Sequence, residues 1–333
     1  MEKKRKFSAV AVTFGSCADR YVLSGYSPKK SFEEMLDGAK QVPDLSGVEL
    51  VWGWHLNDDN ADEIVEMIKN KGLEISMIIP ELWSNSKWWK GSFAAKDKEI
   101  RRQARERVKT AMTLAKKTGC NQVSPWFGQD GYDYVFQADY IASWDAIVDG
   151  LVECADFLPD VRLAVEYKIK EPRTHNFVST IGKVLLLINE VNRPNVGVNL
   201  DIGHALQAYE SMAEDVALLK RFGNKLFHLH LNDNYRMWDD DMMPFSVHTL
   251  ENLELLYWLE KVGYDRWYSL DVFPYREDGV ELATEAIEWL KGLFNLLDKI
   301  GMNEIEKVIQ LEDPIKALKL LRCALLQQNN LSF

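Results

Sequence analysis

Cysteine and histidine are scarce in this sequence, and basic residues are not in excess. The 333 residues include 4 cysteines and 6 histidines. The cysteines lie far apart and form no Cys-x-x-Cys pair, which argues against a disulfide framework and against a thiolate metal site. They are Cys17, Cys120, Cys154 and Cys323. This usage is typical of a protein kept in a reducing cytosol.

The charge balance restricts the class of partner. The chain has 40 basic and 51 acidic side chains, which gives a formal net charge of −11. Nucleic-acid and anionic membrane surfaces bind clusters of Lys and Arg, so we expect neither as a partner. No run reaches the roughly 18 apolar residues of a membrane span. The basic start, Met1–Lys6, is not followed by the apolar stretch of a signal peptide. We therefore expect a soluble cytoplasmic protein.

Short apolar or β-branched runs alternate with longer helical stretches along most of the chain. This alternation is typical of a parallel sheet with crossover helices, and about eight such pairs close a barrel. The predicted fold class is α/β, a (β/α)8 TIM barrel. Its predicted strands are Phe7–Phe14, Gly47–Trp52, Glu74–Ile79, Gln122–Trp126, Arg162–Tyr167, Val196–Leu200, Leu226–Leu231 and Trp267–Val272.

The helical stretches have apolar residues on one face. In Lys96–Lys117, apolar residues recur at positions 100, 104, 108, 111 and 114. The patterns at Ala138–Phe157, Val178–Val191, Thr249–Val262 and Leu282–Leu297 are similar. No linker divides the chain, so we predict one catalytic barrel over residues 1–300. Two further helical patterns, Asn303–Gln310 and Pro314–Gln328, predict a C-terminal helical extension over residues 301–333.

Charged residues and histidines gather where the last four predicted strands end. Catalytic groups of such barrels come from these ends and the loops after them. Residues two apart on a strand share a face, as Glu166 and Lys168 do. In chain order the group contains Glu166, Lys168, Asp201, His204, His228, His230, Asp239, Asp240, Asp241 and Asp271.

Four of these residues form a candidate metal-ligand set: Glu166, Asp201, His230 and Asp271. A charge that points into a barrel mouth loses hydration unless it is paired or binds a metal. Each residue alone has an ordinary structural explanation, such as a helix cap, a salt bridge or a hydrogen-bonded core histidine. Their corresponding places on consecutive strands favour metal binding. Oxygen donors dominate, which suits Mn²⁺, Mg²⁺ or Co²⁺ better than Zn²⁺.

At these residues the sequence resembles the xylose isomerase-like TIM-barrel superfamily. The segment EYKIKEPR, Glu166–Arg173, is similar to the Glu-Pro-Lys-Pro-x-Glu-Pro stretch of xylose isomerases. DIGHA, WFGQDG and the acidic stretch LNDNYRMWDDD resemble further motifs of those enzymes. The order Glu, Asp, His, Asp along the last four strands resembles L-rhamnose isomerases.

The sequence also departs from these relatives. The spacing from His230 to Arg236 resembles ketose 3-epimerases, but those enzymes carry Glu on the eighth strand and lack a counterpart of Lys168. Xylose isomerases have a catalytic histidine on the second strand. Here Val51 stands in that register, and His55 follows four residues later.

The resemblance implies a metal centre and a reaction. The first metal, Mn²⁺ in preference to Mg²⁺ or Co²⁺, is expected among the four residues above. A second metal would use His204, Asp239 and Asp241, although consecutive aspartates are usually a solvated loop. Lys168 would stabilise negative charge on a carbonyl oxygen, or else form a salt bridge with Glu171. Together with Glu166 and Asp271 it forms the predicted catalytic set of an aldose–ketose isomerase that works by hydride shift.

The expected partner is a small sugar, held in part by aromatic side chains. The candidate substrate-binding residues are His55, Trp83, Trp126, His204 and Arg236. Aromatic rings suit the apolar face of a sugar, although tryptophans also pack in cores, and an arginine can be a surface ion pair. Relatives suggest a homodimer or homotetramer.

Other functions remain open from the sequence alone. A ketose 3-epimerase would move a proton at carbon 3, and a C-glycoside-cleaving lyase subunit would need a partner chain. A DNA-repair endonuclease of the endonuclease IV type would need more histidines and a basic face. A non-catalytic sugar-binding barrel would fit an incomplete metal set.

Overall fold

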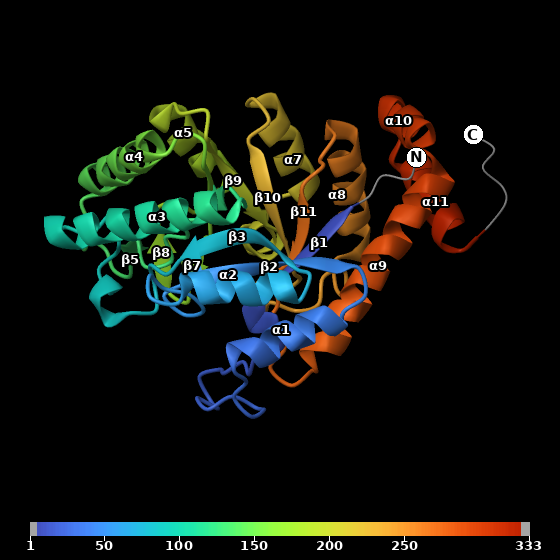
Figure 1. The fold of residues 1–333 in the computed structure, drawn as a ribbon. Helices are drawn as coiled ribbons and strands as arrows, with labels where there is room; N and C mark the ends of the chain where they lie inside the picture. Colours follow the sequence, from blue (N-terminus) through green and yellow to red (C-terminus); the bar gives the residue numbers. More distant parts are fainter. Residues whose placement is uncertain (1–4, 328–333) are drawn as a thin grey trace.

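The computed structural model describes residues 5–327, and eight parallel strands close into a barrel as the sequence predicts (Figure 1). Neighbours around the barrel follow the order β1-β11-β10-β9-β6-β4-β3-β2. The barrel strands are β1 (Lys6–Val10), β2 (Leu45–Trp52), β3 (Glu74–Pro80), β4 (Gln122–Val123), β6 (Arg162–Glu166), β9 (Val196–Asp201), β10 (Leu226–Leu231) and β11 (Trp267–Leu270).

Helices surround the barrel and begin at recognisable caps (Figure 1). The Asp97 side chain accepts a hydrogen bond at the start of α3, and Gly119 ends that helix with a φ of 83°. The surrounding helices are α1 (Phe32–Gln41), α2 (Ala61–Asn70), α3 (Lys98–Thr118), α4 (Tyr140–Phe157), α5 (Ile181–Val191), α7 (Met212–Arg221), α8 (Thr249–Val262) and α9 (Gly279–Ile300). The five amphipathic patterns of the sequence are confirmed as α3, α4, α5, α8 and α9.

Four predicted strands end earlier than the sequence pattern suggested, β6 and β11 by one and two residues, and the first and fourth strands by more. The first ends at Val10, and a 3-10 turn, η1 (Ala11–Phe14), follows because Phe14 turns into the core, where it is fully buried. The fourth keeps only two residues, since Pro125 has no N–H to continue the ladder. Trp126 still reaches the barrel through an isolated bridge to Glu166.

The barrel interior has an apolar side and a polar side. Val10, Val51, Met77 and Ile79 form an apolar cluster of their own. Barrels of this type are usually filled by such branched side chains. Here interior positions on β4, β9, β10 and β11, and one position on β2, carry buried polar side chains. These are Glu49, Gln122, Asn199, His228 and Ser269. A hydrogen-bonded interior therefore lies directly beneath the mouth of the barrel.

A small antiparallel sheet, which the sequence pattern did not reveal, lies beside the mouth. It pairs β5 (Gly131–Tyr132) with β8 (Thr174–Asn176) and β8 with β7 (Lys170–Glu171). This sheet folds the segment after β6 back on itself, and the Lys168 amide donates to Val178 O at 3.2 Å. Two short helices, η2 (Ser86–Trp88) and α6 (Ile202–Gln207), complete the loops.

The C-terminal helices α10 (Met302–Leu311) and α11 (Pro314–Leu325) pack beside α9, outside the ring of helices (Figure 1). Ile300, Val308 and Leu320 form their shared apolar cluster. The domain boundary at residue 300 stays a prediction, and the predicted helix end at Gln328 lies outside the described residues. Within residues 5–327, no helix is long and apolar enough to cross a membrane.

Candidate metal centre

Four consecutive strands bring one possible ligand each to the mouth of the barrel. Glu166 ends β6, Asp201 ends β9, His230 lies near the end of β10, and Asp271 follows β11. One ligand atom from each lies within 4.8 Å of all the others. Asp271 is partly exposed, whereas the other three residues are buried. The four-residue set predicted from the sequence is thus assembled in space.

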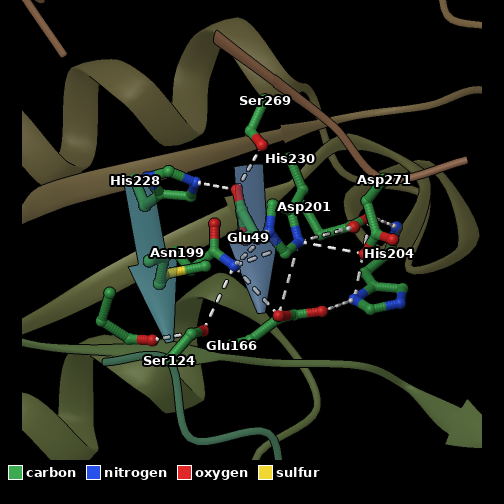
Figure 2. Close-up of polar contacts among 12 residues, drawn as sticks. Glu49, Ser124, Glu166, Asn199, Asp201, His204, His228, His230, Ser269 and Asp271 are labelled. Carbon is green, nitrogen blue, oxygen red and sulfur yellow. Dashed lines mark hydrogen bonds and ion pairs between the residues drawn. The ribbon is translucent and has the colours of Figure 1, made fainter. Parts of the chain in front are cut away.

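The imidazole of His230 lies among the three carboxylates (Figure 2). Its Nδ1 is 3.1 Å from Asp271 Oδ2, 3.5 Å from Glu166 Oε2 and 3.6 Å from Asp201 Oδ2. One ring nitrogen therefore faces every carboxylate of the set. We refer to Glu166, Asp201, His230 and Asp271 as the metal group.

Neighbouring side chains hold two of these carboxylates in place. The Asn232 amide donates to both oxygens of Asp201 at 3.2 and 3.0 Å. The His204 backbone N–H also donates to Asp201, which caps α6. Asn199 donates to Glu166 Oε2 at 2.9 Å. Both carboxylates are thereby oriented before any ligand binds.

The electrostatics of the metal group favour a cation. Burial raises the pKa of Glu166 to about 7; His230 and His204 oppose the rise, while Asp201 and Asp271 add to it. Buried carboxylates that are not fully compensated by positive charge are costly. A divalent cation would supply that charge, and three carboxylates with one imidazole are donors that such a cation accepts. The residues present therefore fit a divalent metal.

The second predicted metal set is arranged differently. His204 Nε2 is 3.2 Å from Asp239 Oδ2, and the Lys168 ammonium is 2.6 Å from the same oxygen. Burial raises the pKa of Asp241, and nearby Asp239 and Asp271 raise it further. Among the described residues, the groups with metal-ligand spacing include none of His204, Asp239 and Asp241. The second metal stays a prediction, and a lysine ammonium contacts the carboxylate that would bind it.

Lys168 is buried beside the metal group, where it is 4% exposed. It forms ion pairs with Asp239 and with Glu171, the alternative partner foreseen from the sequence. Although burial opposes it, these carboxylates raise the pKa of Lys168, so its ammonium stays charged. Nζ also lies 5.2 Å from the centre of the Trp126 ring. The side chain is therefore a fixed cation at the edge of the site.

Tryptophan rings form one wall of a cavity above the metal group. The Trp83 and Trp126 ring centres are 5.0 Å apart, and those of Trp54 and Trp83 are 5.5 Å apart. The cavity has a volume of about 90 Å³. Its lining combines apolar groups with three of the metal group: Val10, Val12, Val51, Trp54, Ile79, Trp83, Trp126, Glu166, His230, Asp271 and Phe273.

The remaining candidate substrate residues lie farther out or have other partners. His55 is buried, stacks on Phe32, and accepts the Val51 N–H on Nδ1 at 3.0 Å. Arg236 donates to the Leu206 carbonyl at 3.3 Å and lies beside α8. Neither side chain lines the cavity above the metal group. His204 is close to it, because its Nδ1 is 3.4 Å from Glu166 Oε1.

An open groove lies beside the candidate metal centre and shares Phe273 with the cavity above the metal group. Its volume is about 1440 Å³, and Asp239, Asp241 and Phe273 are among its lining residues. Tyr235 and Trp238 lie farther out on the acidic segment after β10.

Glu49, which the sequence reasoning missed, lies beneath the metal group on β2 (Figure 2). It is fully buried, and its carboxylate contacts His228 Nε2 at 2.7 Å and His230 Nε2 at 3.0 Å. Although burial opposes it, the two histidines hold the pKa of Glu49 well below its usual range. The available signal was a single charged residue inside the apolar run Val48–Trp52.

His228 lies on β10 two residues before His230, deeper in the barrel. Among the described contacts, it touches no carboxylate of the metal group. The Gln122 amide nitrogen is 2.9 Å from its Nδ1. Since an amide N–H donates to this nitrogen, the ring hydrogen lies on Nε2, which faces Glu49. From the sequence we predict that His228 orients a metal ligand. In the structure His228 and His230 are linked indirectly, because both contact Glu49.

A protein-family model identifies the class of this barrel. The xylose isomerase-like TIM barrel family matches residues 38–293, most of the chain. The protein therefore belongs to that family. The matched range includes the whole metal group and Glu49.

Solved structures with the same fold include sugar-modifying enzymes. A D-tagatose 3-epimerase-like protein is 18% identical, with a TM-score of 0.67, over 89% of this chain and 99% of that one. A D-psicose 3-epimerase from Clostridium cellulolyticum H10, solved with D-tagatose, is 15% identical, with a TM-score of 0.65, over 86% and 99%. A xylose isomerase domain protein from Alicyclobacillus acidocaldarius is 17% identical, with a TM-score of 0.63, over 87% and 98%. At such identities the likeness concerns the fold.

Proposed function

We propose that this protein is a divalent-metal-dependent sugar isomerase that interconverts an aldose and a ketose. The metal group beneath the tryptophan-lined cavity is the observation that carries the proposal. Its oxygen-rich donors suit Mn²⁺ first, with Mg²⁺ or Co²⁺ as alternatives. The aromatic wall suits the apolar face of a small unphosphorylated sugar. A bound cation would polarise the sugar carbonyl and stabilise a neighbouring alkoxide.

The side chains around this site have distinct proposed roles. Lys168 donates a hydrogen bond to the carbonyl oxygen as negative charge develops there, since it remains charged although buried. Trp83 and Trp126 hold the sugar against the metal group and exclude water from it. Glu166 and Asp271 line the same cavity and hold the reacting carbons between them. His204, His55 and Arg236 stay proposed as substrate-binding residues of the wider site.

The reaction can be tested with purified protein and a panel of aldoses. The protein is stripped with EDTA, reloaded with Mn²⁺, Mg²⁺ or Co²⁺, and assayed for ketose formation. We expect one metal to restore conversion of at least one aldose, and an Asp271→Asn variant to lose it. If saturating metal yields no ketose from any aldose, the proposed reaction is wrong.

A ketose 3-epimerase is the second candidate, and two observations favour it. Several solved structures with this fold carry that name. Two carboxylates, Glu166 and Asp271, also line one cavity, as proton removal and return at carbon 3 require. Turnover in deuterium oxide separates the two reactions. Epimerisation by proton transfer predicts deuterium at carbon 3 of the product, whereas a hydride shift predicts little exchange.

A further inference from the structure

The contacts of Glu49 differ from those of the other carboxylates in the barrel. It lies on β2, on the side of the barrel away from the strands that carry the metal group, and it reaches across the interior. Three side chains meet its carboxylate: His228 and Ser269 at Oε1, and His230 at Oε2. All four side chains are fully buried or nearly so. A buried anion is thus held by three specific donors and no solvent.

These contacts hold the His230 ring between Glu49 and the metal group. An ionised carboxylate only accepts hydrogen bonds, so the nitrogen that faces Glu49 must donate. His230 Nε2 is 3.0 Å from Glu49 Oε2, and Nδ1 is 3.1 Å from Asp271 Oδ2, so both ring nitrogens face carboxylates. A cation held by the metal group would take the place of the Nδ1 hydrogen and leave the hydrogen on Nε2. In the opposite tautomer, Nε2 and the carboxylate would face each other as two acceptors. With a metal at Nδ1, the neutral ring would therefore be the Nε2–H tautomer, which keeps its hydrogen bond to Glu49.

Asn199, a further polar neighbour of His230, does not distinguish between the two ring nitrogens. Its amide nitrogen lies 3.2 Å from Nδ1 and 3.4 Å from Nε2, nearly the same distance from both. Its better hydrogen bond goes to Glu166 at 2.9 Å. Among the described contacts of the two ring nitrogens, only the carboxylate of Glu49 bonds one nitrogen from the side opposite the metal group.

We infer that Glu49 is a positioning residue of the metal centre, which fixes the Nε2–H tautomer and ring orientation of His230 so that Nδ1 binds the metal. This inference rests on the metal site of the proposed function. Carboxylates that bind the free N–H of a metal-ligating histidine typically contribute 10- to 100-fold, roughly, to metal affinity. Here the carboxylate also binds a second histidine, so Gln122, His228, Glu49 and His230 form one chain of donors and acceptors beneath the metal.

The wild-type protein provides the first test. Protein labelled with ¹⁵N-histidine and loaded with ¹¹³Cd²⁺ is analysed by long-range proton–nitrogen correlation, and His230 is assigned from a His230→Gln sample. We expect cadmium coupling at Nδ1 and a proton on Nε2. Cadmium at Nε2, or a proton on Nδ1 of the loaded protein, would overturn the inference, because either would break the contact with Glu49.

The second test compares two variants that each change a buried carboxylate into its amide. In Glu49→Gln one carboxylate oxygen becomes an NH2 group, so the side chain can no longer accept from His228 and His230 together. Mn²⁺ should then bind about 10- to 100-fold more weakly. Asp130→Asn is the matched control, since Asp130 is equally buried but bonds Ser92 and Ala94. It should lower the melting temperature without changing the Mn²⁺ dissociation constant.

The outcomes separate this inference from the proposed function. Unchanged Mn²⁺ affinity in a folded Glu49→Gln protein would overturn the positioning role. If that variant does not fold, the cadmium experiment on the wild type still decides. A wild type that binds metal through His230 Nδ1 but converts no sugar would contradict the proposed function and support the role of Glu49. A wild type that binds no metal would overturn both.

Discussion

Lys168 is the residue whose chemistry most distinguishes this site from a simple metal-binding cluster. A lysine that is 4% exposed keeps its charge only because Asp239 and Glu171 surround it. Those ion pairs also fix Nζ next to the Trp126 ring. An ammonium held in this way can stabilise developing negative charge without rearranging first. The residue thus links the acidic segment after β10 to the proposed chemistry.

Replacing Lys168 by Met should separate catalysis from metal binding. We expect kcat to fall by about 10²- to 10³-fold, the usual loss when a preorganised donor is removed. The Mn²⁺ dissociation constant should hardly change, because Lys168 is not in the metal group. Lys170→Met, two residues along the chain on β7, is the control and should retain activity. Full activity in Lys168→Met would contradict the catalytic role.

His55 should make stability depend on pH. Burial lowers its pKa from 6.5 to about 4, so the folded protein holds the ring neutral. The unfolded chain takes up a proton more readily, so this contribution is complete above pH 6.5 and is lost as the pH falls toward 4. The loss is at most about 3 kcal/mol.

Urea unfolding of wild type and His55→Gln across this pH range measures the effect. The free energy of unfolding of the wild type should decrease more steeply with falling pH than that of the variant. Parallel curves would mean that the histidine does not titrate as its burial implies.

At the scale of elements, the turn from β9 into α6 orients Asp201, one of the proposed metal ligands. Asn232 on the neighbouring segment donates to Asp201 and accepts the Gly203 N–H at 2.6 Å. A methyl group on Gly203 would overlap the Asn232 side chain and also approach Asn234. Glycine fits this position because the Asn232 side chain, which bonds both Gly203 N–H and Asp201, leaves no room for a methyl group.

Gly203→Ala should therefore weaken metal binding and stability together. We expect a loss of about 1–3 kcal/mol in the free energy of unfolding and a weaker Mn²⁺ affinity. Gly182→Ala in α5 is the control, since the nearest atom to its new methyl group lies 4.0 Å away. That change should be neutral or stabilising by up to about 1 kcal/mol. Thermal melts and Mn²⁺ titrations of both variants measure these effects. If Gly203→Ala matches Gly182→Ala in stability and Mn²⁺ affinity, Asn232 can move to make room for the methyl group.

The sequence was a good guide to elements whose pattern is local. The eight strands follow from alternation and are confirmed. The geometry of parallel barrels also predicts that the residues at four strand ends meet, and the structure brings them together. Glu49 could not be placed, because its partners are as many as 220 residues away and only the closed barrel brings them together. The contact of Lys168 with Asp239 likewise depends on how a long loop folds back. The local sequence pattern contains no information on such long-range contacts.

For the whole molecule, a bound cation should couple metal binding to folding stability. The barrel buries Glu166 and Asp201 and half-buries Asp271, in a chain whose formal net charge is already −11. A ligand that binds only the folded state adds about 2.7 kcal/mol when present at 100 times its dissociation constant. Mn²⁺ should therefore raise the melting temperature, and EDTA should reverse the rise. Scanning calorimetry of wild type and Asp271→Asn tests this, because the variant should lose most of the increase.

Anomalous diffraction at the manganese edge tests the central claim most directly. Crystals grown with Mn²⁺ should show one strong peak enclosed by Glu166, Asp201 and Asp271, on the Nδ1 side of His230. An otherwise ordered barrel with no peak at this position under saturating Mn²⁺, or with manganese only elsewhere, would contradict the account.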